Sequence, residues 1–187
     1  MKSLTLLAGP GLALALTFTM PVTPVGAAEK AAPGKGDHAF MTEAASGGLM
    51  EVELGKYAAQ HAASDRVKQF GQTMVDDHSK ANDELKQVAA QKDVELPAKM
   101  NKEHRATADR LMKMKGAEFD RAYMKTMVED HEHDVAKFRT ESKSAQDPDV
   151  KSFAAKTLPT LEHHLEMAKE VSARTGSATS GAGMHRD

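Results

Sequence analysis

The sequence contains no cysteine and no tryptophan, and aromatic residues make up only 4% of its 187 residues. Because cysteine is absent, the chain can form neither a disulfide framework nor a thiolate metal site. The formal net charge of -2 lacks the basic excess that a nucleic-acid-binding domain usually carries. We therefore expect no nucleic-acid partner.

Motifs of several enzyme classes are also missing. The chain has no glycine-rich phosphate loop and no serine nucleophile motif. A di-iron carboxylate site needs Glu-x-x-His pairs and several carboxylates. The nearest match is Asp130-x-x-His133, and His133 points away from the apolar face of its predicted helix. These absences disfavour an enzymatic function.

Long apolar runs are missing after the N-terminus. The stretch from Leu4 to Met20 is mostly apolar but is interrupted by glycine and proline, so a membrane anchor is the weaker interpretation. Lys2 supplies a positive start and the small residues at 25–28 offer a cleavage site, so residues 1–28 are predicted to be a secretory signal peptide. The mature chain would have no transmembrane segment and would lie in the periplasm or outside the cell, with outer-membrane association left open.

What the sequence does contain is helical periodicity. With 12 methionines and abundant alanine, its composition is typical of a helical protein with a core of thin side chains. The apolar spacing predicts an all-α, ferritin-like antiparallel four-helix bundle with an additional short helix between the second and third long helices. The predicted helices span 38–62, 65–92, 98–114, 117–144 and 148–174. They form one domain over 37–174, between a linker at 29–36 and a disordered tail at 175–187.

Single residues mark several boundaries of these helices. Asp37 is a plausible N-cap of the first helix, and Gly116 is predicted to close the short helix. Pro148 suits the first position of the last helix, whereas Pro159 lies inside that helix and is expected to bend it. The pair at 47–48 is glycine, which favours close approach by a neighbouring helix.

A repeated motif organises the chain. Thr-Met-Val-Asp-Asp-His at 73–78 returns as Thr-Met-Val-Glu-Asp-His at 126–131, and an aromatic residue lies three positions before each copy, Phe70 and Tyr123. Repeats of this kind indicate repeated structural units. In both copies the histidine lies in the middle of an apolar stripe and not on a polar helix face.

Each long helix carries one metal-competent side chain at the centre of its apolar stripe. These residues are Glu51, His78, His131 and His164. Counting from the turns at about 1.5 Å per residue, the two members of each helical hairpin differ in height by only about 3–5 Å. The sequence does not determine the height of one hairpin against the other.

A carboxylate and three imidazoles in a bundle core suit a first-row transition metal, namely Zn, Cu, Fe or Mn. Four buried polar groups at one level need a shared partner. Asp77, Asp130 and Asp134 flank the stripes and are expected to orient the ligands. The alternative is a hydrogen-bonded network of the same four residues with no metal.

Other polar and methionine residues receive a structural interpretation. Met74 and Met127, one turn before the motif histidines, are expected to fill the core, with copper ligation as the alternative. Glu53 lies opposite the apolar face of the first helix and is expected to be solvated. His104 is expected at the surface.

Four segments resemble a known family. They are residues 47–56, 74–78, 119–123 and 154–161. Together they are similar to the ferritin-like "domain of unknown function 4142" family of bacterial envelope proteins, over about residues 38–174. The resemblance implies a ferritin-like bundle exported from a Gram-negative cell, and it implies no reaction, because the family has no established one.

Two functional hypotheses follow. The first is metal binding in the bundle core for metal buffering or envelope stress protection. The second is a structural or interaction module of the envelope that contains no metal. The sequence does not identify a protein partner and does not distinguish a monomer from a homodimer.

Overall fold

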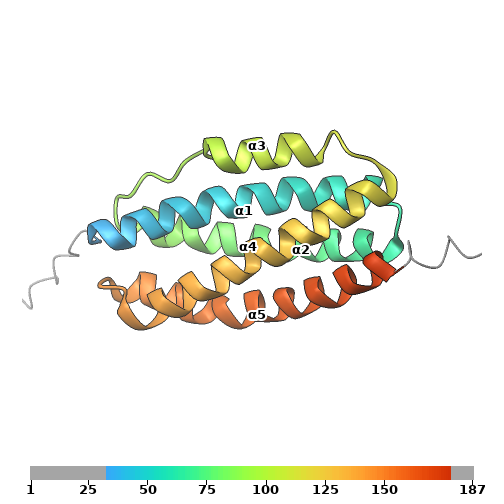
Figure 1. Ribbon diagram of the computed structural model, residues 1–187. Coiled ribbons are helices and arrows are strands. Elements are labelled where there is room, and N and C mark those ends of the chain that lie inside the picture. The colour runs from blue at the N-terminus through green and yellow to red at the C-terminus, as the bar shows by residue number, and fades with distance from the viewer. Residues whose placement is uncertain (1–32, 178–187) are drawn as a thin grey trace, which may run out of the picture.

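The computed structural model describes residues 33–177, which form five α-helices and no strand (Figure 1). The helices are α1 (Lys35–His61), α2 (Asp65–Ala90), α3 (Lys102–Leu111), α4 (Gly116–Ser144) and α5 (Pro148–Ser177). The expected signal peptide lies outside the described residues, as do most of the expected linker and positions 178–187 of the expected tail. None of the helices in the described part has the length and apolar content needed to cross a bilayer.

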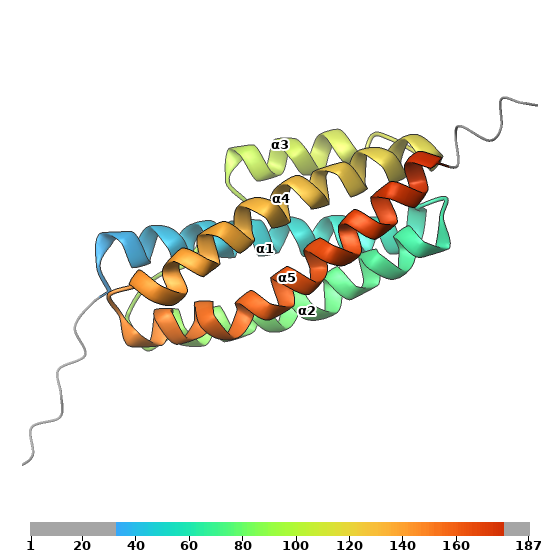
Figure 2. The same ribbon diagram turned by 60° about the horizontal axis from the view of Figure 1, so that its bottom comes forward.

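The four long helices form an antiparallel bundle of two hairpins, α1–α2 and α4–α5 (Figures 1 and 2). The hairpins meet where α2 packs against α5 and α1 against α4. The short helix α3 runs back along the bundle and packs on α1 and α4, so that α4 starts at the same end as α2. This arrangement confirms the predicted bundle with a short helix between the second and third long helices.

Several predicted boundaries differ from the observed ones. The first helix begins at Lys35, with Gly34 at the N-cap, so the prediction that Asp37 is the N-cap is wrong. The last helix begins at Pro148, as predicted, but continues to Ser177. Helix ends fray, so apolar periodicity locates a helix better than it locates its terminal residues.

The short helix is shorter than the predicted 98–114. It begins after Asn101, whose side chain accepts a 2.8 Å hydrogen bond from the backbone N–H of His104. Gly116 does not close this helix but starts α4, with a positive φ of 58° that favours glycine. The expected helix end was therefore placed at a residue that turns the chain into the next helix.

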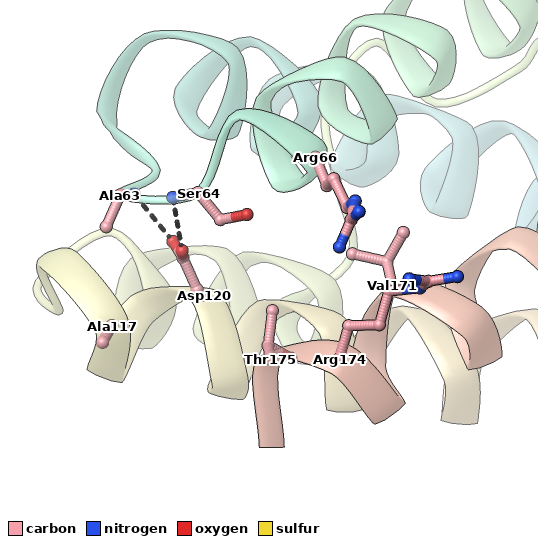
Figure 3. Close-up of a pocket in the computed structure, with 8 residues that line it drawn as sticks. All are labelled: Ala63, Ser64, Arg66, Ala117, Asp120, Val171, Arg174 and Thr175. Carbon is pink, nitrogen blue, oxygen red and sulfur yellow. Dashed lines mark hydrogen bonds between the residues drawn. The ribbon is translucent and has the colours of Figure 1, made fainter. Parts of the chain in front are cut away.

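Two buried aspartates hold the hairpins in register with each other. Asp120 on α4 accepts hydrogen bonds from the backbone N–H groups of Ala63 (3.0 Å) and Ser64 (2.8 Å) in the α1–α2 turn (Figure 3). Asp37 on α1 accepts from the backbone N–H groups of Gln146 (3.1 Å) and Asp147 (2.8 Å) in the α4–α5 turn. Each hairpin thus binds the turn of the other, which sets the relative height that the sequence left undetermined.

Glycines allow α1 and α2 to approach closely. A Cβ on Gly55 would lie 2.7 Å from the carbonyl oxygen of Gly71, and a Cβ on Gly71 would lie 2.8 Å from the carbonyl oxygen of Gly55. Gly48, one of the predicted close-approach glycines, faces the Asn82 side chain on α2, whereas Gly47 faces His104 on α3. Close packing between the first two long helices therefore depends more on Gly55 and Gly71 than on the expected pair.

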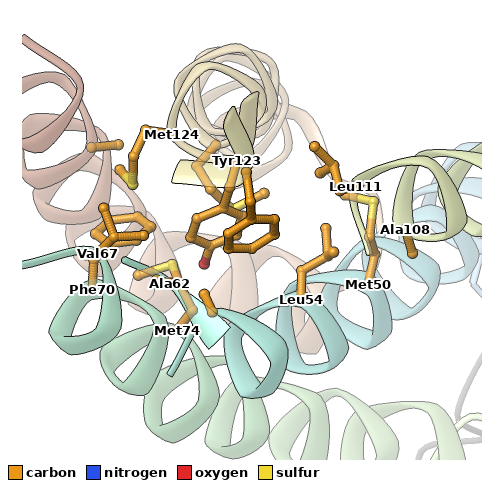
Figure 4. Packing of buried hydrophobic residues seen from close by; sticks show 14 residues of the cluster. Met50, Leu54, Ala62, Val67, Phe70, Met74, Ala108, Leu111, Tyr123 and Met124 are labelled. Carbon is orange, nitrogen blue, oxygen red and sulfur yellow. The ribbon is translucent and has the colours of Figure 1, made fainter. Parts of the chain in front are cut away.

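Two apolar clusters fill the bundle, and a polar layer lies between them. One cluster includes Phe70, Met74 and Tyr123 (Figure 4), and the other includes Phe40, Phe138 and Phe153. Along each long helix, the buried Glu or His of the predicted site lies between residues of the two clusters. Apolar packing therefore separates this layer from both ends of the bundle.

Candidate metal centre

Four helices each contribute one side chain to the polar layer: Glu51 from α1, His78 from α2, His131 from α4 and His164 from α5. Their exposed fractions are 1%, 5%, 0% and 0%. The three imidazole ring centroids lie 5.2 to 5.6 Å apart. The Glu51 carboxylate lies 2.8 Å from His78 Nδ1 and 3.5 Å from His131 Nε2. The structure thus brings together all four side chains that the apolar stripes singled out.

One nitrogen of each imidazole is held by an oxygen atom. His131 Nδ1 donates to the Met127 carbonyl at 2.9 Å, His164 Nε2 donates to Asp77 Oδ2 at 3.0 Å, and His78 Nδ1 lies 2.8 Å from Glu51 Oε2. A carbonyl oxygen only accepts, so His131 Nδ1 carries the hydrogen and Nε2 has the free lone pair. The Asp77 carboxylate also only accepts, so His164 Nε2 carries the hydrogen and His164 Nδ1 has the free lone pair.

The remaining three nitrogens are His78 Nε2, His131 Nε2 and His164 Nδ1. All three are buried and have no hydrogen-bond partner within the described residues. One nitrogen from each ring forms a group whose members all lie within 4.8 Å of one another. A tetrahedral metal with bonds of 2.0–2.1 Å needs nitrogens about 3.3 Å apart, so each ring would move inward by about 1 Å or less. The donor set therefore fits a metal ion with small adjustments.

Asp130 lies closer to the centre than the sequence predicted. Glu51, Asp130 and His131 form a second group whose ligand atoms all lie within 4.8 Å of one another. Asp130 Oδ2 and Glu51 Oε1 are buried without a hydrogen-bond partner in the described chain. Asp130 was expected to orient a ligand, but the geometry makes it a ligand candidate. The sequence signal that could have indicated this ligand role is the position of Asp130, directly before His131 and at the edge of the apolar stripe.

Burial controls the ionisation of these groups. Removal from water lowers the pKa of His78 to about 4, of His131 to about 3 and of His164 to about 4. Burial also raises the pKa of Glu51 to about 8, and burial together with the Glu51 charge raises the pKa of Asp130 to about 7. At neutral pH the imidazoles are therefore neutral, which is the form that binds metal, and Glu51 retains a proton that a metal would displace.

A cavity of about 20 Å³ lies beside Glu51 and His78, and Asn82 and Asp134 also line it. This volume holds about one water-sized species. Asp134 lies 3.5 Å from His133 Nδ1, on the same helix. Burial and the nearby carboxylates of Glu51 and Asp130 raise the pKa of Asp134 well above its usual range.

Predictions for the surrounding residues had mixed outcomes. Met74 and Met127 are fully buried in an apolar cluster, consistent with core filling. His104 was wrongly expected at the surface, since its side chain is only 14% exposed and its Nδ1 lies 2.7 Å from Ser46 Oγ. Glu53 keeps 38% of its side chain exposed, and Arg105 on α3 binds both of its carboxylate oxygens at 2.7 and 2.9 Å. The error for His104 arises because α3 packs on α1 and brings this side chain against Ser46.

Comparisons with known proteins identify the fold and the family. The chain is similar to the crystal structure of a DUF305 fragment from Deinococcus radiodurans, with 12% sequence identity and a TM-score of 0.67 over 77% of this chain and 99% of that one. At this identity the likeness shows the helical-bundle fold alone. No curated protein matches the chain. The family model described as "Domain of unknown function (DUF4142)" matches residues 22–171, and the chain belongs to that family.

Proposed function

We propose that this bundle binds one first-row transition-metal ion in its core through Glu51, His78, His131 and His164, and that it serves in metal buffering or envelope stress protection. Two observations carry the proposal: each of the three buried imidazoles keeps one nitrogen without a hydrogen-bond partner in the described chain, and one nitrogen of each ring lies within 4.8 Å of the others. The other nitrogen of each ring is held by an oxygen, which is the usual arrangement around metal-binding histidines.

A metal explains the tautomers better than direct contacts among the rings do. His131 Nε2 and His164 Nδ1 both carry lone pairs, because the opposite nitrogen of each ring donates to an oxygen. Two acceptors cannot hydrogen-bond each other, and each buried unpaired acceptor costs about 1–3 kcal/mol. A cation satisfies all the lone pairs at once. In the network without a metal, a protonated Glu51 donates to one histidine, and at least one imidazole lone pair is left for a water molecule.

The donor set indicates the class of metal. Three imidazoles, one carboxylate and no sulfur favour Zn, Cu or Fe over Mg or Ca, with Mn the weakest of the four transition metals expected from the sequence. Asp130 lies within reach as a further oxygen ligand for metals that bind more than four groups. The cavity beside Glu51 and His78 holds only a water-sized species, which supports metal binding over turnover of an organic substrate.

The predicted signal peptide supports a role outside the cytoplasm. Residues 1–28 have the charge and apolar pattern of a secretory signal, so we infer that the mature protein acts in the periplasm or outside the cell. In that location a buried site would take up a metal ion and protect it from other ligands. Localisation of a C-terminally tagged full-length chain by cell fractionation tests this inference, and recovery in the cytoplasm would contradict it.

Elemental analysis of the untagged protein tests the metal site. We expect about one metal ion per chain, retained after dialysis, and its loss in the His78→Ala/His131→Ala double variant. The matched control is His133→Ala/His163→Ala, which removes two exposed histidines from the same bundle and should leave the metal content unchanged. Circular dichroism checks that both variants remain helical.

The opposite outcome is equally informative. If the wild-type protein takes up no Zn, Cu, Fe or Mn after incubation with their salts, the polar layer is a hydrogen-bonded network. A structural or interaction role in the envelope would then replace metal binding. Equal metal content in the two double variants would also contradict the proposed ligands.

A further inference from the structure

A pocket of about 320 Å³ lies between α1, α3 and α4. We call it the vestibule. Its ionisable lining consists of four carboxylates and two imidazoles: Glu43, Glu103, Glu129, Asp130, His104 and His133. Within the described part of the chain, no lysine or arginine is among the residues that line it. Lys125 pairs with Glu129 at 3.4 Å from outside the lining, which leaves the vestibule with an acidic balance.

Asp130 connects the vestibule to the buried centre. It lines the pocket, and it also belongs to the group whose ligand atoms lie within 4.8 Å of Glu51 and His131. Asp130 Oδ2 is buried without a hydrogen-bond partner, as is Oε1 of Glu51, a residue that is only 1% exposed. Oxygen and nitrogen atoms able to bind a cation therefore continue from the vestibule into the core, and α3 carries one wall of this path.

Helix α3 is firmly attached in this position. Ser46 Oγ on α1 lies 2.7 Å from His104 Nδ1 and accepts from the backbone N–H of Asn101 at 2.8 Å. The Arg105 guanidinium binds the Glu53 carboxylate through two hydrogen bonds. These contacts fix the vestibule wall and place Glu103 and His104 opposite the carboxylates of α1 and α4.

We propose that the vestibule is the entry route by which a divalent transition-metal cation reaches the core, with Asp130 passing it to Glu51 and His131. This inference rests on the proposed metal site. A cleft lined by one sign of charge and walled by protein focuses the electric field and raises the local concentration of counter-ions. The acidic lining thus accelerates metal uptake, while the buried ligands determine equilibrium affinity.

Stopped-flow measurement of Co²⁺ uptake tests the route, because Co²⁺ absorbs visible light when it enters a nitrogen-rich site. The variant Glu43→Gln/Glu103→Gln removes two vestibule charges and keeps the side-chain shapes. We expect its association rate constant to fall about 3-fold to 10-fold at low ionic strength, with the difference shrinking as salt is added. The final stoichiometry should stay that of the wild-type protein.

The control variant is Asp76→Asn/Glu166→Gln. It makes the same change in net charge at exposed positions on α2 and α5, two helices that contribute nothing to the vestibule. Its rate should match that of the wild-type protein. A second pair, Thr107→Lys and Thr107→Gln, places a positive or a neutral side chain at the same vestibule position, and only the lysine should slow uptake.

The outcomes separate the route from the site. Normal Co²⁺ binding with unchanged rates in the vestibule variants would overturn the route alone. Equal slowing in the control variant would also overturn it, because net charge and not the vestibule would then set the rate. Failure of the wild-type protein to bind Co²⁺ would overturn the core site and the route together.

Discussion

The two copies of the repeated motif have nearly the same sequence but different electrostatic surroundings. The histidine of each copy is buried in the polar layer, at His78 on α2 and His131 on α4. The aspartates that precede them differ. Asp77 is 33% exposed and accepts a hydrogen bond from His164, whereas Asp130 has a buried oxygen without a partner in the described chain. The motif therefore repeats the position of the histidine but not the role of its neighbour.

The pKa values of the two aspartates shift in opposite directions. Partial burial acts to raise the pKa of Asp77, but the hydrogen bond from His164 and the charge of Lys80 outweigh it and lower this pKa. Burial and the nearby Glu51 carboxylate raise the pKa of Asp130 to about 7. The difference arises because Asp77 faces a histidine on α5, while Asp130 faces carboxylates on α1. The local sequence around each aspartate does not show which helix packs against that aspartate.

Glu51→Gln should have the largest effect, because it removes the one carboxylate that contacts both motif histidines. We expect metal affinity to fall about 100-fold or more, since an amide carries no charge and binds transition metals weakly. Competition titration against a chromophoric chelator measures the change. Glu53→Gln, two residues away on the same helix, is the control, and an equal loss of affinity in both variants would contradict the assignment.

Asp77→Asn should weaken metal binding by about 10-fold to 100-fold, because the Asp77 carboxylate orients His164 and makes its ring more basic. The same titration measures this effect. Asp76→Asn removes the neighbouring exposed carboxylate and should change affinity little. If Asp77→Asn binds metal as tightly as the wild-type protein, the orienting role of Asp77 is wrong.

The stability of the metal-free protein should fall as pH rises from about 6.5 to 8. The three histidines have lowered pKa values, so their contribution is complete above their ordinary pKa of 6.5 and is lost only as pH falls. The pKa values of Glu51 and Asp130 are raised to about 8 and about 7, so both groups bind a proton more tightly in the folded state than in the unfolded state. The stability that these protons contribute is lost as the pH rises through those two values. The expected slope is at most about 1.4 kcal/mol per pH unit for each proton.

Urea denaturation at several pH values measures this slope. Asp130→Asn should reduce it, whereas Asp77→Asn should not, because the pKa of Asp77 is lowered. Saturating metal should flatten the slope, since the metal-bound state holds Glu51 deprotonated, as the unfolded state does in this pH range. A flat profile in the metal-free wild-type protein would contradict the raised pKa values.

The smallest effect concerns the aromatic residue three positions before each copy of the motif. Tyr123 is fully buried and its hydroxyl has no hydrogen-bond partner within residues 33–177, whereas Phe70 has no hydroxyl at the matching position. Tyr123→Phe should therefore stabilise the protein by about 1 kcal/mol. Tyr57→Phe is the opposite case, because the Tyr57 hydroxyl donates to the Met112 carbonyl at 3.0 Å, and it should be destabilising by a similar amount. Thermal or urea unfolding distinguishes the two signs.

Much of this architecture could be predicted from the sequence because apolar spacing reports which face of a helix is buried. That spacing located four long helices and selected Glu51, His78, His131 and His164, which the structure brings together. Their role as metal ligands stays a prediction. Contacts made by α3 were assigned less well, since a helical wheel cannot show that His104 packs against Ser46 of α1 or that Arg105 binds Glu53.

The sequence by itself determined the helices, their buried faces and the pairing of side chains within each hairpin, because these depend on local periodicity and short turns. Only the tertiary structure decided how the hairpins meet. Asp37 and Asp120 bind backbone N–H groups of the opposite turns and so align the two halves. That alignment places Asp130 beside Glu51 and opens the vestibule beneath α3. Such contacts join residues far apart in the chain, and no pattern of neighbouring residues encodes them.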